Sequence, residues 1–374
     1  MQAVAVGWEL YERTNSALAL GFVGLAQALP VVALTLLGGQ AADVFDRRRI
    51  VIISQIIFAL CAVGLALVSA AHGPVLAIYG LLIVCGAARA FNSPARASLL
   101  PLIVEPEVFG NAVAWNSGAF QFAAIAGPAL GGVLIAATDV AWPAYAGTAA
   151  GCLMFAVALV GVRPPVKEPR TVSLSLGALG AGMSYVWREK TILAAITLDL
   201  FAVLLGGATS LLPIYAKDIL DVGPEGLGLL KAAPYAGALL MALILAHRPP
   251  FRRAGPAFLW AVAAFGVATI VFGLSRSFPL SLAMLALAGA VDNISVVIRH
   301  ILVQVRTPDE VRGRVSAVNS VFIECSNELG GFESGVVANW FTPVISVVSG
   351  GIGTIVVVLA IAGVWPEIRR LRRI

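Results

Sequence analysis

The fold is decided by a stretch of 32 residues that occurs twice, first as residues 86–117, GAARAFNSPARASLLPLIVEPEVFGNAVAWNS, and again as residues 289–320, GAVDNISVVIRHILVQVRTPDEVRGRVSAVNS. Ten positions are identical at a constant offset of 203 residues, without a gap. A second match, residues 24–30 against residues 228–234, lies close to the same offset. Two copies of one unit in the same order indicate an internal duplication.

The composition indicates that most of the chain is surrounded by lipid. It is 59% hydrophobic and 12% charged, with a mean hydropathy of +0.93, whereas a soluble domain carries about 25% charged residues. A helix that crosses about 30 Å of hydrocarbon needs about 20 apolar residues. Eleven stretches meet this need and are predicted to span: 18–42, 50–70, 75–94, 112–136, 143–162, 191–215, 226–246, 257–274, 278–303, 314–340 and 344–365.

The duplication predicts how these spans are grouped. The second copy holds six of them, whereas the first holds five and a stretch, residues 1–13, that is too short to cross. We expect an all-α membrane protein of two six-helix bundles related by pseudo-two-fold symmetry, with the first helix incomplete. The expected division is an N-terminal bundle over 1–162, a polar, proline-containing linker over 163–190 and a C-terminal bundle over 191–374.

The basic residues predict the topology. Of the 25 Lys and Arg residues, 19 lie in six loops or tails that alternate along the chain. By the positive-inside rule these segments, including the C-terminus, are expected on the cytoplasmic side of a bacterial inner membrane. The net charge of +5 then reflects orientation in the membrane and indicates no nucleic-acid partner. The six segments are 43–49, 95–111, 163–190, 247–256, 304–314 and 366–374.

A charged loop follows the first complete span. Residues 39–51 contain Gly39, Asp43, Asp46, Arg47 and Arg48, and this loop resembles the signature loop after helix 2 in the major facilitator superfamily. The resemblance implies a latch between the two halves on the cytoplasmic side, in which the aspartate at the helix end faces the N-terminus of the helix that starts near 314. The sequence departs from the family pattern at positions 41, 44 and 46. A simpler interpretation is a helix stop followed by positive-inside charges.

Two further segments carry a resemblance to exporters. Gly127, Pro128, Gly131 and Gly132 are similar to the helix-5 motif of the superfamily's antiporter branch, and small residues of this kind also serve ordinary helix packing. Residues 304–335 resemble the prokaryotic drug and siderophore exporter branch, which includes the transmembrane secretion effectors. The resemblance implies export in exchange for protons.

Ionisable residues within the spans are the candidate pathway residues. Each costs several kcal/mol in hydrocarbon, so each is expected to face a cavity or a partner. In the superfamily, helices 1, 4, 7 and 10 line the central cavity, which implies cavity positions for several of them. The candidates for the substrate and proton pathway are Arg89, Asp199, Asp292, Arg299, Glu324 and Glu328.

The duplication adds a hypothesis about Arg89 and Asp292, which occupy equivalent positions in the two copies with opposite charge. We expect them at the same depth and hypothesise that they pair across the cavity in one state. The alternative is that Arg89 snorkels from its helix. Glu324 and Glu328 lie four residues apart on one helix face, where like charges repel; a proton site and a pair satisfied by neighbouring partners remain equally open.

These features together predict a secondary active transporter that exports a small amphipathic molecule by proton-coupled alternating access. No phosphate-binding loop of the Walker type is present in the sequence, so we expect neither an ATP-driven pump nor an enzyme. The scattered cysteines and histidines predict no metal site, and no cofactor is expected. The expected partners are the small-molecule substrate, protons and membrane lipids, with the chain acting as a monomer. The alternatives are an importer or facilitator of the same fold, and a truncated remnant that no longer transports.

Overall fold

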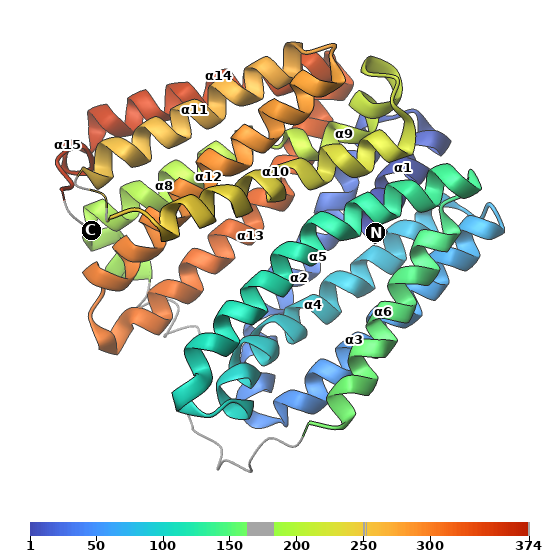
Figure 1. Ribbon diagram of the computed structural model, residues 1–374, viewed down its shortest axis with the longest axis horizontal. Coiled ribbons are helices and arrows are strands. Elements are labelled where there is room, and N and C mark those ends of the chain that lie inside the picture. The colour runs from blue at the N-terminus through green and yellow to red at the C-terminus, as the bar shows by residue number, and fades with distance from the viewer. Residues whose placement is uncertain (163–182, 250, 252, 373–374) are drawn as a thin grey trace.

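The computed structural model of the chain describes residues 1–162, 183–249, 251 and 253–372. The side chains of some residues inside these ranges, Glu324 among them, lie outside the description. The regular elements of the described residues are all helical, as Figure 1 shows. The predicted all-α membrane fold is thereby confirmed.

The long helices of the first half pack mainly on one another, with α2 against α4 and α3 against both α4 and α6. In the second half α10 packs against α12, and α11 packs against α12 and α14. The first half comprises α1 (Gln2–Thr14), α2 (Ala17–Val44), α3 (Arg47–Ala70), α4 (Val75–Ile103), η1 (Pro106–Val108), α5 (Phe109–Thr138) and α6 (Trp142–Val160). The second half comprises α8 (Lys190–Leu205), η2 (Ala208–Leu211), α9 (Leu212–Ile214), η3 (Tyr215–Ile219), α10 (Gly223–Ala246), α11 (Ala254–Leu274), α12 (Phe278–Arg306), α13 (Asp309–Trp340), α14 (Pro343–Val364) and α15 (Pro366–Arg369).

Side-chain caps fix where two helices of the first half begin. The Ser16 hydroxyl accepts a hydrogen bond from the Ala19 amide at 3.3 Å and starts α2. Asp46 caps α3, where its carboxylate accepts from the Arg48 amide at 2.9 Å. These oxygens satisfy amide groups that the first helical turn leaves without intrahelical partners. The aspartate that replaces a glycine in the charged loop is therefore a capping residue.

One predicted span is interrupted. The sequence predicted a single helix over 191–215, but α8 ends at Leu205 and the chain continues through η2 and α9 to a π-helical turn, η3. Gly206 and Gly207 lie at the break, and a side chain at Gly207 would meet the Gly330 carbonyl at 2.5 Å. Glycine here allows α13 to approach the backbone closely, at the cost of helix continuity.

The helix predicted over 314–340 is present as part of α13, but its composition differs from that of the other long helices. Among the described residues, ten helices are long and apolar enough to cross a membrane, and α13 is not one of them. Its 32 residues include glutamates at 310, 324, 328 and 333. A helix this polar is expected to face the protein interior and a water-filled space.

The duplicated residues meet in equivalent pairs. Gly86 of α4 lies against α2, where an added side chain would meet Pro30 at 2.6 Å. In the second copy, Gly289 of α12 lies against Pro234 of α10, with a closest approach of 1.9 Å for an added side chain. The same two sequence matches therefore build the same helix contact in each half. This is the structural counterpart of the repeat.

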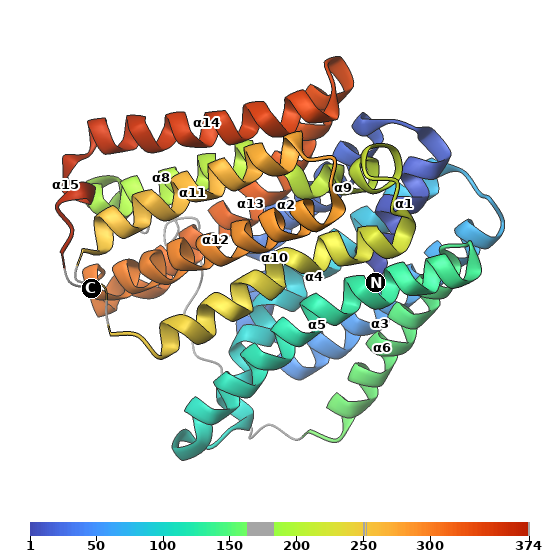
Figure 2. The same ribbon diagram turned by 45° about the horizontal axis from the view of Figure 1, so that its top comes forward.

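The halves contact each other through two helix crossings, α2 with α13 and α5 with α10. Gly24 touches the backbone of Glu328 in the first crossing, and Gly132 touches Gly228 in the second. Both crossings lie toward the end of the molecule that holds residues 14–17, 139–141 and 220–222, which we call the closed end. The opposite end, with residues 45–46, 104–108 and 247–249, is the basic end. Figure 1 shows α5 and α10 diverging toward the basic end, and Figure 2 shows the same arrangement after a 45° turn.

Candidate functional site

A cavity of about 720 Å³ lies between the two halves. Helices of both halves line it, and the lining combines apolar side chains with amide, hydroxyl and charged groups. This volume falls in the range of small-molecule sites. The polar and charged lining residues are Gln2, Gln27, Gln55, Arg89, Asn92, Arg96, Thr209, Ser210, Lys231, Tyr235, Asn327 and Glu328.

Arg89 crosses from the first half to the second inside this cavity. One guanidinium nitrogen, Nη1, lies 3.4 Å from Glu328 Oε1 on α13. The other, Nη2, donates to Gln27 Oε1 on α2 at 3.2 Å. Arg89 is therefore held by the two helices that form one of the crossings between the halves. A charged group in the membrane is expected to have partners of this kind.

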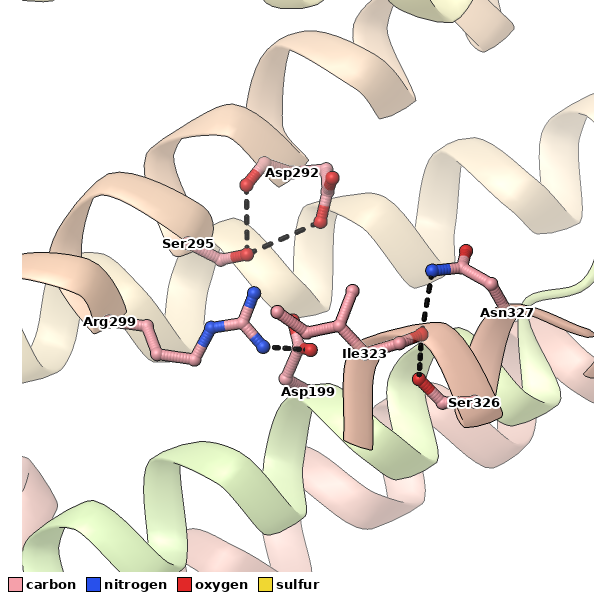
Figure 3. Close-up of polar contacts among 7 residues, drawn as sticks. All are labelled: Asp199, Asp292, Ser295, Arg299, Ile323, Ser326 and Asn327. Atoms are coloured by element: carbon pink, nitrogen blue, oxygen red, sulfur yellow. Dashed lines mark hydrogen bonds and ion pairs between the residues drawn. The ribbon is translucent and has the colours of Figure 1, made fainter. Parts of the chain in front are cut away.

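In the described conformation Arg89 does not have the partner that the repeat suggested, and a pair in another state stays a prediction. The sequence hypothesis paired Arg89 with Asp292, but Asp292 instead accepts a hydrogen bond from Ser295 Oγ on its own helix at 3.3 Å. Figure 3 shows Asp292 with Ser295 and, beside them, Arg299 pointing at Asp199. Equivalent positions in two copies need not face each other, because the distance between them depends on how the halves are tilted.

Arg299 and Asp199 form a buried ion pair between α12 and α8. Their side chains are 3% and 6% exposed, respectively. Neither lines the cavity, so the structure separates them from Arg89 and Glu328. Arg299 Nε is buried and has no partner among the described residues. The pair therefore links α12 to α8 within the second half. On the neighbouring helix α13, the Ile323 carbonyl accepts hydrogen bonds from Ser326 and Asn327 (Figure 3).

Of the two α13 glutamates predicted as pathway residues, the structure describes the side chain of one. Glu328 lines the cavity and pairs with Arg89. The side chain of Glu324 lies outside the described residues, so its predicted role is neither placed nor tested. Asp292 is half-buried and belongs to the same region of α12 as the buried pair.

Lys231 of α10 is a cavity residue that the sequence analysis did not select. Its Nζ donates to the Ala3 carbonyl of α1 at 2.7 Å, which links the two halves. A signal for it existed in the repeat, because Lys231 is the equivalent of Gln27, and both residues line the cavity. That signal is weak, because the two equivalent side chains differ: Gln27 is an amide and Lys231 is a cation.

The closed end carries two polar links between α1 and η3. Tyr11 donates its hydroxyl proton to Asp218, and Lys217 Nζ lies 2.8 Å from Glu12 Oε1. Behind them, Glu9 pairs with Arg13 and accepts from the Tyr145 hydroxyl at 2.8 Å. Together they connect α1 and α6 to the interrupted span that begins with α8 and ends at η3. The sequence analysis did not select these residues as a site.

The small-residue motif of α5 lies at the crossing of the halves. A side chain on Gly132 would meet the Pro224 carbonyl at 2.4 Å, and one on Gly228 would meet the Pro128 carbonyl at 2.7 Å. Gly131 lies against Met1. The close approach gives Gly132 a packing role, whereas the exchange function implied by the family resemblance stays a prediction.

The charged loop makes its described contacts within the first half. Arg47 Nε donates to the Ala42 carbonyl at 2.9 Å and its Nη2 lies 3.9 Å from Asp43. Arg48 Nε donates to the Leu159 carbonyl of α6 at 2.8 Å. For these side chains the structure describes no contact with the second half. Gly39 is buried where α2 approaches its end. The latch between the halves stays a prediction for a different conformation.

Comparison with solved structures establishes the fold. The chain superposes on the nucleoside transporter NupG with a TM-score of 0.74 at 12% identity, covering 97% of this chain and 94% of that one. It superposes on the inward open conformation of the xylose transporter XylE from E. coli with a TM-score of 0.71 at 15% identity, covering 96% and 91%. The fold, with its cavity between two halves, is the fold of these solved transporters.

The chain belongs to the transmembrane secretion effector family, whose model matches residues 1–369. It is 27% identical to the multidrug efflux pump Tap of Mycolicibacterium fortuitum, over 90% of this chain and 84% of that protein. It is also 27% identical to the enterobactin exporter EntS of Citrobacter koseri, over 99% of this chain and 89% of that protein. The predicted superfamily and exporter branch are thereby confirmed.

Proposed function

We propose that the protein exports a small amphipathic molecule by alternating access, and that the described conformation is the one that loads substrate. The observation that carries this proposal is the cavity, which lies between helices that meet at the closed end and diverge toward the basic end. The links between α1 and η3 hold the closed end together. A transporter that opens the closed end and shuts the basic end would present the same cavity to the other side of the membrane.

The proposed sidedness follows from charge. The basic end and the C-terminus would face the cytoplasm of a bacterial inner membrane, because Lys and Arg are concentrated in the loops there. The cavity would then load from the cytoplasm. The names of the relatives, an efflux pump and an exporter, support the outward direction. The halves, 1–162 and 191–374 with the linker between them, would move as two bodies within a monomer.

Proton coupling is proposed on the carboxylates near the cavity. Glu328 holds Arg89 across the halves, and Asp292 lies beside the buried pair of α8 and α12. A proton on Glu328 would remove the charge that attracts Arg89, which would change the relative stability of the two conformations. Asp292 and Glu328 are therefore the proposed proton-exchange residues.

The test is accumulation of fluorescent amphiphiles in a bacterial strain that lacks its own efflux pumps. Expression of the chain should lower the steady-state accumulation of at least one member of a cationic, neutral and anionic panel, and a protonophore should restore it. Asp292→Asn, matched in size, should lose most of the effect while reaching the membrane in equal amount. Higher accumulation would identify an importer. Unchanged accumulation with folded protein in the membrane would overturn transport of this class of molecule.

A further inference from the structure

Lys231 carries a positive charge into the cavity without a described carboxylate partner. An ammonium group has three donors, and the structure fills one of them with the Ala3 carbonyl at 2.7 Å. A charged side chain at membrane depth is normally paired, and a single carbonyl leaves the charge itself uncompensated. An anionic group beside Lys231 would compensate this charge.

The charge balance of the cavity points the same way. Among the lining residues with described side chains, Arg89, Arg96 and Lys231 are cationic and Glu328 is the one carboxylate. That carboxylate is already engaged with Arg89. The described wall is thus positive overall, and it would attract an anionic group that enters the cavity.

The positions of these cations suit one ligand held between the halves. Arg89 enters from α4 of the first half, and Lys231 enters from α10 of the second and reaches α1. The residue equivalent to Lys231 in the first copy is Gln27, which accepts from Arg89 at 3.2 Å. The remaining wall is largely apolar, with Val6, Leu20, Val23, Phe58 and Leu82. This combination accommodates an apolar body that bears a negative group.

We propose that the substrate is an amphipathic organic anion and that Lys231 is the residue that binds its carboxylate or comparable anionic group, with Arg89 as the second cation. The proposal deepens the export function and rests on it. It assigns Lys231 to specificity, because a neutral or cationic analogue would leave the ammonium group without a counter-charge.

The test uses purified protein in phosphatidylcholine nanodiscs, which supply no anionic lipid that would compete. Three probes of similar size are compared by equilibrium binding: 1-naphthylacetate, 1-naphthylacetamide and 1-naphthylmethylammonium. We expect the acetate to bind about tenfold or more tightly than the other two, the discrimination that one charge-assisted hydrogen bond provides. Lys231→Met should abolish this preference and Lys231→Arg should retain most of it. Arg276→Met, which removes a cation from an exposed loop, is the control and should change nothing.

Equal affinity of the folded wild type for the three probes, no binding of the acetate, or an unchanged preference in Lys231→Met would overturn the proposal. The thermal unfolding of each variant shows whether it is folded. If Lys231→Met does not fold, Lys231→Arg still tests the proposal, because it should keep most of the preference for the acetate. The accumulation assay reads the export function separately. A chain that exports a neutral or cationic amphiphile but shows no preference for the acetate keeps its function and loses the inferred substrate class.

Discussion

The buried pair of Asp199 and Arg299 shows how a charged residue can be structural in a transporter. Both side chains are nearly inaccessible, and burying two ions is expensive unless each compensates the other. We predict that Asp199→Asn lowers the free energy of unfolding by about 3–5 kcal/mol, because it leaves the Arg299 charge unpaired. Thermal or denaturant unfolding in detergent measures the loss.

The double variant Asp199→Asn with Arg299→Met is the matched control for that prediction. It removes both charges and should recover most of the stability lost in the single variant, because no uncompensated ion remains. A single variant as stable as the wild type, or a double variant less stable than either single one, would show that the pair does not stabilise the second half.

Arg89 and Glu328 form the ion pair within the cavity, and it joins the two halves. We predict that Arg89→Glu and Glu328→Arg each abolish transport, since each replaces an ion pair whose atoms lie 3.4 Å apart by two like charges that repel. The double swap should restore part of the transport rate. Efflux from preloaded cells measures it.

The comparison for that swap is Arg89→Asp with Asp292→Arg, the pair that the repeat suggested. The structure places Asp292 with Ser295, so this exchange should give no rescue. Rescue by this exchange, and none by the exchange with Glu328, would return Asp292 to the role of partner in another conformation.

At the level of single residues, the sequence identified charged residues that need a partner, but it did not identify which partner each one has. The cost of a charge in lipid made Arg89, Asp199 and Arg299 conspicuous, and the structure gives each of them a partner. The partner depends on helix rotation and on the tilt of the halves, which no spacing along the chain encodes. Lys231 lies within the predicted span 226–246 and meets the same criterion, but the sequence analysis did not select it.

At the level of elements, glycines set how closely the halves approach at the closed end. A side chain on Gly132 would meet the Pro224 carbonyl at 2.4 Å, and the backbone there has no flexible end to move aside. We predict that Gly132→Val pushes α5 away from α10, reduces transport and costs about 1–3 kcal/mol of stability, the usual cost of overpacking. Spin labels at residues 139 and 221, in a background without the native cysteines, should report a longer distance by pulsed electron paramagnetic resonance.

Gly80→Val is the control for that experiment. Gly80 lies on α4, and nothing lies within 4 Å of an added side chain. It places the same residue type in a transmembrane helix without a steric conflict. An equal effect from both substitutions would show that β-branching in the helix, rather than the crossing at Gly132, is responsible.

Helix positions were the part of the fold most accessible to sequence. Apolar length located the long helices. The two matches of the repeat correspond to a contact that the structure contains twice, Gly86 with Pro30 and Gly289 with Pro234. The break after α8 was missed because apolar residues continue on both sides of Gly206. Hydropathy measures the preference for lipid, and it does not register whether backbone hydrogen bonds run without interruption.

At the level of the whole molecule, the described conformation contains contacts that would break in the proposed transport cycle. Glu12 and Lys217 join the two halves at the closed end, and their side chains are 45% and 30% exposed. A pair so exposed contributes up to about 1 kcal/mol. Because the proposed cycle separates α1 from η3, this contribution favours the closed arrangement of that end and is absent once the end opens.

We predict that Glu12→Gln with Lys217→Met shifts the equilibrium toward opening by up to about fivefold, the population change that corresponds to about 1 kcal/mol. Ser210→Cys, a cavity-lining position, in a background without the native cysteines, should then react correspondingly faster with an impermeant maleimide added outside spheroplasts. The reversed pair Glu12→Lys with Lys217→Glu should restore the slow reaction, and Arg276→Met should leave it unchanged. An unaltered reaction rate in the neutral pair would show that these charges do not hold the end shut.

The same neutral pair tells which step limits export, since it alters one conformation and leaves the cavity residues in place. In each proposed cycle the closed end opens with substrate bound and closes again after the substrate has left. A weaker contact at the closed end lowers the free-energy barrier to opening that end. It also makes the return to the closed arrangement less favourable. A higher export rate in Glu12→Gln with Lys217→Met would therefore identify opening as the slow step. A lower rate, at equal substrate affinity, would identify the return.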